Sequence, residues 1–113
     1  MLGGSSDKLA GEADSGVALN PHPLVVWKYR ALLVPGGHPL EFPAGARVLS
    51  AGVQGSDVVL WVLVDPQAQE RATQRVHIVG TGHPIGVEDA RSLRFIGTVE
   101  YPGGEWFHVF VEG

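Results

Sequence analysis

The sequence predicts an all-β fold, namely a small single-domain sandwich or barrel of six or seven mostly antiparallel strands. Short runs rich in β-branched and aromatic residues alternate with turns that contain Gly or Pro, at close spacing. No amphipathic helical pattern of useful length interrupts them. The chain has 113 residues, of which 44% are hydrophobic, so we expect one compact core that forms without disulfide staples.

The amino-terminal part differs in composition from the rest. It is rich in Gly, Ser and acidic residues and contains no aromatic residue. Such a segment offers too little apolar surface to offset the entropy lost on ordering. We therefore expect residues 1–23 to form a disordered tail and residues 24–113 to form the β domain.

Seven runs in the β domain have strand character. They cover residues 24–30, 40–42, 47–54, 57–64, 74–79, 93–101 and 105–111. Every residue from Val58 to Val64 is apolar, so both faces of this strand should be covered, and we expect it to be central.

Turn residues indicate how these runs connect. Gly55-Ser56 predicts a tight hairpin between the third and fourth runs, and Pro102-Gly103-Gly104 predicts one between the last two. Strict alternation along the sixth run would place Phe95 and Val99 on one face. Residues 87–91 have room for a single helical turn.

Charge and composition exclude several classes of protein. The formal net charge is −4 and basic residues are scattered, which argues against a face that binds duplex nucleic acid. The absence of cysteine excludes a disulfide scaffold and a cysteine nucleophile. No run approaches the roughly 20 apolar residues of a membrane span, and no apolar leader follows Met1. We expect a cytoplasmic protein that makes no membrane contact.

The stretch IVGTGHPI, residues 78–85, comes closest to a chemical motif. Its glycines allow the backbone amides of Gly80, Thr81 and Gly82 to turn inward around an anion. Arg75 and His77 share a face of the preceding strand that leads to this loop.

These residues form our hypothetical ligand-binding set, which comprises Arg75, His77, Gly80, Thr81, Gly82 and His83. A small anionic, nucleotide-like ligand fits a set made of one guanidinium, imidazoles and backbone amides. The alternative is a turn that only lets the chain leave a strand before Pro84.

His83 also raises two chemical hypotheses, one for a general base and one for a metal ligand. An imidazole is the usual general base near neutral pH, so a small hydrolase using His83 is an alternative function. His77, His83 and His108 could approach one another if their strands are neighbours, yet the sequence has no short histidine pairing typical of a metal site. We expect no catalytic residue, metal or cofactor.

Aromatic residues suggest an interface. In the last run, Trp106 and Phe110 share one face with His108, while Phe107 and Val109 occupy the other. Two apolar faces indicate that this strand is internal or that it packs against another subunit. Large aromatics are favoured at interfaces, so we expect a homo-oligomer with Trp27, Trp106 and Phe110 at its interface.

Several motifs carry a family resemblance. They are VVWKYRALL, FPAGARVLSAGVQGSDVVLWVLVDP, IVGTGHPI and RFIGTVEYPGGEWFHVFVEG. In order and spacing they resemble a family of short uncharacterised proteins of bacteriophages and prophages, over about residues 24 to 113. This chain departs from the family pattern in its longer connection at residues 34–38 and in its tail.

The resemblance implies a phage accessory protein made in the cytoplasm of the host. Small β proteins of phages often inhibit or sequester a component of host defence. We therefore expect a non-enzymatic binding protein whose partner is a host factor or a nucleotide-like anionic ligand, and counter-defence is its candidate role. The alternative is a protein-interaction or structural module of the phage.

Overall fold

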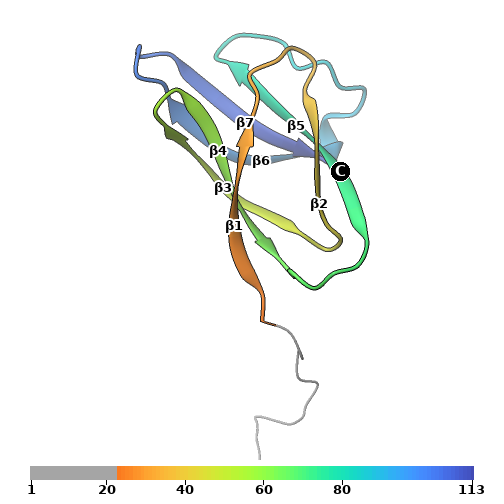
Figure 1. Ribbon diagram of the computed structural model, residues 1–113. Coiled ribbons are helices and arrows are strands. Elements are labelled where there is room, and N and C mark those ends of the chain that lie inside the picture. Colours follow the sequence, from red (N-terminus) through yellow and green to blue (C-terminus); the bar gives the residue numbers. More distant parts are fainter. Residues whose placement is uncertain (1–22) are drawn as a thin grey trace, which may run out of the picture.

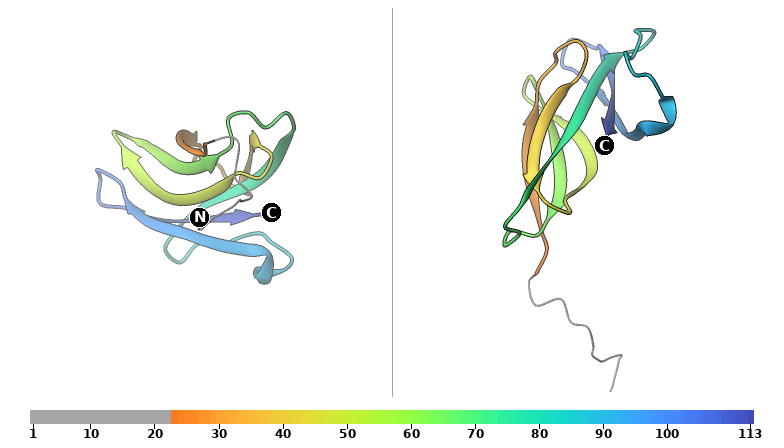
Figure 2. Two further views of the ribbon diagram at one scale, coloured as in Figure 1. Left: turned by 90° about the horizontal axis from the view of Figure 1, so that it is seen from below. Right: turned by 90° about the vertical axis from the view of Figure 1, so that its right-hand side faces the viewer.

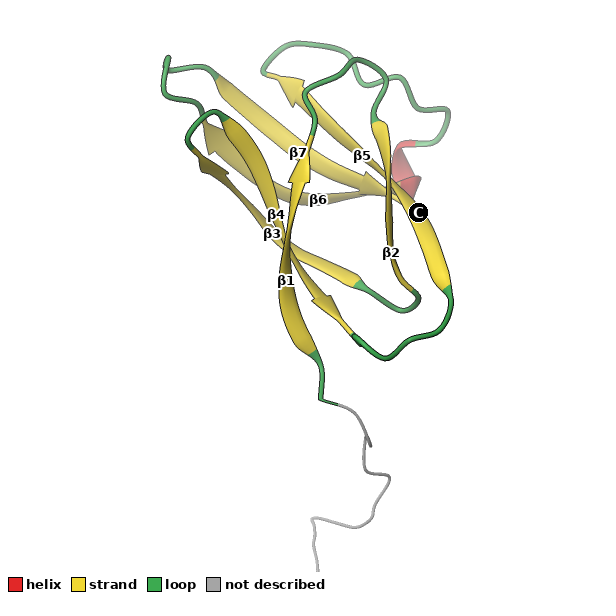
Figure 3. Cartoon of the chain, in the orientation of Figure 1, coloured by secondary structure: helices red, strands yellow, loops and turns green. Residues whose placement is uncertain are grey.

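The computed structural model describes residues 23–113, which form seven strands in two antiparallel sheets (Figures 1 and 3). The prediction of an all-β domain is confirmed, and of the two architectures proposed, the sandwich is the one observed. The predicted tail lies outside the described residues except for Pro23. The strands are β1 Val25–Ala31, β2 His38–Pro43, β3 Arg47–Gln54, β4 Asp57–Val64, β5 Arg71–Gly80, β6 Leu93–Glu100 and β7 Trp106–Glu112.

The first sheet has the order β1-β4-β3, and the second has the order β2-β5-β7-β6. Seen end-on in Figure 2, they form two layers that face each other. The prediction that residues 57–64 form a central strand is confirmed, because β4 pairs with β1 on one side and β3 on the other. Strand β7 is also internal, between β5 and β6.

The core lies between the two layers and is built largely from valine. Strand β4 contributes Val58, Leu60, Val62 and Val64, and β5 and β7 contribute valines and an isoleucine from the facing layer. β-Branched side chains suit this position because they pack well on a pleated surface. Phe42 of β2 is fully buried and meets Tyr29 of β1 edge-to-face, with 4.8 Å between ring centroids.

The layers also meet at one lateral edge, where β3 lies against β6. Each strand has a β-bulge there, between Val48 and Ser50 in β3 and between Phe95 and Gly97 in β6. The Arg94 guanidinium donates to the Val48 carbonyl at 3.1 Å and so satisfies a backbone acceptor beside the bulge.

The bulge in β6 overturns one prediction. Phe95 and Val99 do not share a face, because the extra residue reverses the alternation between them. Val99 is buried in the core, whereas Phe95 is 56% exposed on the outer face and packs edge-to-face on Phe110.

The connection from β5 to β6 carries the only helical turn within residues 23–113, a 3₁₀ helix at Ala90–Ser92. It begins later than the turn predicted at residues 87–91. Asp89 caps it by accepting from the Arg91 backbone N–H at 2.9 Å. Hydrogen bonds from the Arg91 side chain and then from its backbone lower the pKa of Asp89 below its ordinary value.

Both predicted hairpins are confirmed. In the second, the Gly104 N–H donates to the Tyr101 carbonyl at 2.9 Å, and Gly104 has a φ of +93°. We expect Gly104→Ala to lower the free energy of unfolding by about 1–3 kcal/mol, since an L side chain is strained at that φ. Urea denaturation followed by circular dichroism measures this loss.

Gly103→Ala is the matched control. Its Cβ would meet only the carboxylate end of Glu105, which can rotate away. We expect a change below about 0.5 kcal/mol. Equal losses in the two variants would contradict this interpretation of the turn.

Candidate functional site

The IVGTGHPI stretch ends strand β5 in a hydrogen-bonded turn. The His83 N–H donates to the Gly80 carbonyl at 3.0 Å, which closes a four-residue β-turn. Gly82 occupies the third position with a φ of +86°, which a type II turn requires and glycine adopts without strain. The turn directs the chain away from the sheet and toward the connection between β1 and β2.

Among residues 23–113, His77 is the only polar or charged residue that is buried, with 2% of its surface exposed. It lies on the outer face of β5, opposite Phe110 of β7. Glu112, two residues further along β7, is therefore its diagonal neighbour on that face. His77 Nε2 lies 2.9 Å from Glu112 Oε1, so each side chain supplies a hydrogen-bond partner to the other.

The connection between β1 and β2 covers the His77 ring. A Cβ on Gly37 would lie 2.8 Å from both Nδ1 and Cε1 of His77, so only glycine allows this close approach. Arg75 holds the connection in place, because its Nη1 donates to the carbonyls of Gly36 at 3.4 Å and Gly37 at 3.3 Å. A third hydrogen bond joins the two ends of the connection, because the Leu32 N–H donates to His38 Nε2 at 3.1 Å.

A pocket of about 490 Å³ opens between this connection and the turn. Both segments lie at the upper end of the sandwich in Figure 1. Most of the lining is apolar, and imidazoles from His77 and His83 interrupt it. The lining consists of residues 33–37, 77–80 and 83–86 together with Phe107.

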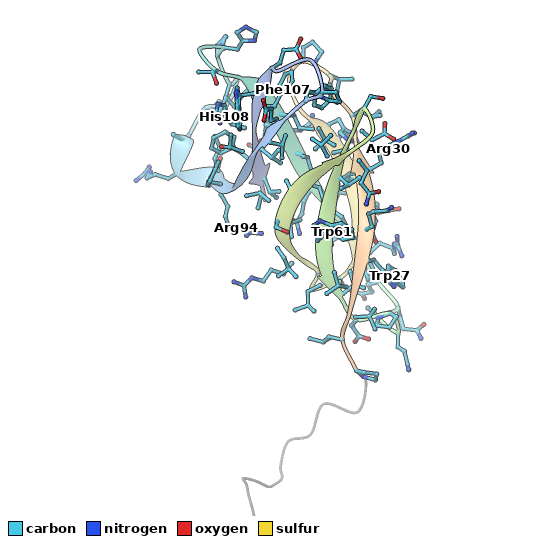
Figure 4. All side chains as sticks on the ribbon, turned by 90° about the vertical axis from the view of Figure 1, so that its left-hand side faces the viewer. Trp27, Arg30, Trp61, Arg94, Phe107 and His108 are labelled. Atoms are coloured by element: carbon cyan, nitrogen blue, oxygen red, sulfur yellow. The ribbon has the colours of Figure 1, made fainter. Side chains whose placement is uncertain are left out.

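The other side of the turn carries a second polar arrangement. His108 Nε2 lies 2.7 Å from Thr81 Oγ1, and its Nδ1 lies 2.9 Å from Thr98 Oγ1. His108 points away from the facing sheet, on the opposite side of the sandwich from Trp61 (Figure 4). Beside it, a hollow of about 280 Å³ is lined by the turn and by residues 105–107.

The structure brings together only part of the predicted ligand set. His77, Gly80 and His83 line the larger pocket. Arg75 and Gly82 do not line it, and Thr81 lines the smaller hollow instead.

Two important neighbours of His77 were absent from the predicted set. From the sequence, Gly37 was recognisable only as part of the turn after Pro35 that ends the first strand. Glu112 could be found only from the register between β5 and β7, which the sequence does not reveal.

The predicted interface residues lie on different sheets. Trp106 and Phe110 lie on the outer face of β7. Phe110 pairs with Phe95 of β6, and Trp106, which is 50% exposed, pairs with Glu100. Trp27 lies on the edge strand β1, opposite Val62, and is 41% exposed. These residues therefore do not form one patch.

Histidines that could have met around a metal have other partners. His77 contacts Glu112, and His108 contacts two threonines. Across residues 23–113, no three His, Cys, Asp or Glu side chains gather in an arrangement suited to a metal ion.

The part of the chain that the structure describes contains no helix long and apolar enough to cross a membrane.

Comparison with known proteins shows the family to which the β domain belongs. A family model described as a domain of unknown function, DUF7352, matches residues 23–113, which is the whole described β domain. The chain belongs to the DUF7352 family. No curated protein and no solved structure matches it. The expectation that the chain belongs to an uncharacterised family is thus confirmed, whereas the link to bacteriophages stays a prediction. The site of this DUF7352 domain must be interpreted from its own geometry.

The contact between His77 and Glu112 makes a prediction about stability. Glu112→Ala would leave the Nε2 group of a buried ring without its partner, so we expect the free energy of unfolding to fall by about 1–3 kcal/mol. Urea denaturation measures the loss.

Glu112→Gln keeps an acceptor oxygen at the same position and should cost less than the alanine variant. If Glu112→Ala is as stable as the parent chain, water replaces the carboxylate and the hydrogen bond does not hold the site together.

Proposed function

We propose that this DUF7352 domain is a non-enzymatic binding protein whose ligand occupies the pocket between the β1–β2 connection and the turn at residues 80–83. The observation that supports this most strongly is a pocket of about 490 Å³ with a buried imidazole in its wall. Ligand sites are commonly concave, mostly apolar and of about 300–1,000 Å³, with a few convergent polar groups.

The lining favours a ligand with an apolar body. Apolar side chains come from both connections, including Val34 and Ile85, and the aromatic ring of Phe107 adds to them. The pocket lining offers no guanidinium to an anionic group, because Arg75 does not line it and its Nη1 donates to the carbonyls of Gly36 and Gly37. A nucleotide-like ligand would therefore place its base, rather than its phosphate, in the pocket.

The biological setting that we propose comes from the sequence resemblance. Under this proposal the protein is a phage accessory protein that acts in the cytoplasm of the infected bacterium, where it counters a host defence by sequestering a small signal or by binding a host factor. A pocket sized for a small molecule supports the sequestering form of this proposal.

The hydrolase alternative has less support. A general base needs a nucleophile or a water-orienting acid within hydrogen-bond reach. Within residues 23–113 the only hydrogen bond found for His83 is the one its backbone makes to Gly80, and the hydroxyl of Thr81 is bonded to His108 instead.

Blocking the pocket tests the binding proposal. Val34 lines the pocket from an exposed position, so Val34→Trp should fill it without disturbing the core. A thermal-shift screen of nucleotides, nucleosides and small heterocycles should give ligands that stabilise the parent chain. At 100 times its dissociation constant, a ligand adds about 2.7 kcal/mol to stability.

Leu32→Trp is the matched control, because Leu32 lies on the same connection and is exposed but does not line the pocket. We expect it to keep the ligand response that Val34→Trp loses. Stabilisation that survives in Val34→Trp would place the ligand elsewhere.

A second candidate function is protein interaction, which the outer face of β6 and β7 favours. The exposed ring of Phe95 packs against Phe110 there, and Trp106, which is also half exposed, lies four residues before Phe110 on the same strand. Aromatic residues are enriched at protein interfaces. We propose that this face mediates the homo-oligomer expected from the sequence, or binding to a host protein.

Sedimentation tests the oligomer. Trp106→Glu should convert a dimer or larger species to monomer, because it places a charge in an apolar interface. Trp27→Glu is the control on the other sheet and should leave the assembly intact. A parent chain that stays monomeric at high concentration would contradict self-association.

A further inference from the structure

We infer that the pocket selects ligands that carry an N–H or O–H donor on a flat apolar body, and that His77 Nδ1 is the atom that accepts this hydrogen bond. This inference rests on the proposed function, since it assigns a chemical class to the occupant of the same pocket. Indole-like and purine-like heterocycles and phenols belong to this class.

The first step concerns the tautomer of His77. A carboxylate can only accept hydrogen bonds, so Glu112 Oε1, 2.9 Å from Nε2, requires the proton to be on Nε2. In the neutral imidazole the other nitrogen then carries a lone pair. Glu112 thereby makes Nδ1 an acceptor.

The second step concerns the surroundings of Nδ1. Within residues 23–113, no protein group hydrogen bonds to this atom, although the His77 side chain is 98% buried. A buried polar atom without a partner costs free energy unless water or a ligand supplies one. The ring edge that carries Nδ1 faces Gly37, and both residues line the pocket.

The third step concerns Gly37. A Cβ at this position would lie 2.8 Å from Nδ1 and from Cε1, so any side chain here would collide with the ring edge that carries the lone pair. The backbone there has a φ of +77°, a conformation that suits glycine. Glycine at position 37 therefore lets the β1–β2 connection pack against His77 while both residues remain part of the pocket lining.

The shape and polarity of the lining complete the assignment. Pro35, Ile85 and Phe107 provide apolar contacts for a flat ring. A ring that offers only acceptors would place a lone pair against that of Nδ1, and the pocket should disfavour it.

The experiment compares indole with benzofuran, which has nearly the same shape but an oxygen in place of the N–H. Binding to the full-length chain is measured by titration in thermal shift and by NMR. We expect indole to bind at least about fivefold more tightly, the factor that corresponds to one ordinary hydrogen bond. In ¹⁵N-histidine spectra, the Nδ1 resonance of His77 should shift with indole and remain in place with benzofuran.

Glu112→Gln provides a matched variant that does not change the pocket lining. Its amide can accept from Nε2 or donate to it, so the tautomer is no longer fixed. We expect the preference for indole over benzofuran to shrink while both compounds still bind. The ¹⁵N measurement on the parent chain needs no variant and decides the question even if Glu112→Gln is unstable.

The outcomes separate this inference from the proposed function. Equal binding of the two compounds, blocked by Val34→Trp, overturns the role of Nδ1 and leaves the pocket as the binding site. If neither compound binds but another chemical class does, and Val34→Trp blocks it, the ligand class is wrong. If no compound in the screen stabilises the chain through the pocket, the inference and the proposed function both fail.

Discussion

Strand β4 imposes the constraint on which the rest of the structure depends, because it is apolar on both faces. Its inner face, with Val58 and Leu60, is covered by the second sheet. Its outer face has no such layer within residues 23–113, yet Val59 is only 4% exposed, because Trp61, Gly52 and the neighbouring strands crowd around it. Because β4 pairs with β1 on one edge and β3 on the other, its outer-face side chains lie among those of neighbouring strands and need no further layer to be largely buried.

The candidate functional residues lie away from this central strand, on the outer face of the second sheet and at one end of the sandwich. The second sheet faces β4 through the valines of β5 and β7, so its opposite face carries His77, His108 and the exposed aromatics without loss of core. The pocket forms where two connections leave the strands, and its lining draws on them more than on the core. Binding residues commonly lie on loops positioned by a rigid scaffold, and this arrangement follows that rule.

The sequence was sufficient for the features that depend on local pattern. The central position of residues 57–64, both hairpins and the alternation of Trp106 with Phe107 follow from apolar periodicity and glycine placement. The bulge at Phe95 was missed because an added residue in a strand leaves no local signal when its neighbours remain β-formers. The candidate site was only partly predicted. His77, Gly80 and His83 do line one pocket, but Gly37 and Glu112 come to lie beside His77 only through the registers of β2 and β7 with β5.

The register of the second sheet also explains why His77 is buried on an outer face. His38 pairs with Val76, so the residue before it, Gly37, comes opposite His77, and any side chain at Gly37 would collide with the ring. Glu112 reaches the same ring from the other side of β5, as the diagonal neighbour on β7. A histidine placed only to fill space would be poorly suited to this position, because a leucine needs neither partner and leaves no nitrogen unpaired. The pairing of one nitrogen, together with the unpaired state of the other in the wall of the pocket, is the arrangement that the proposed recognition of a hydrogen-bond donor requires.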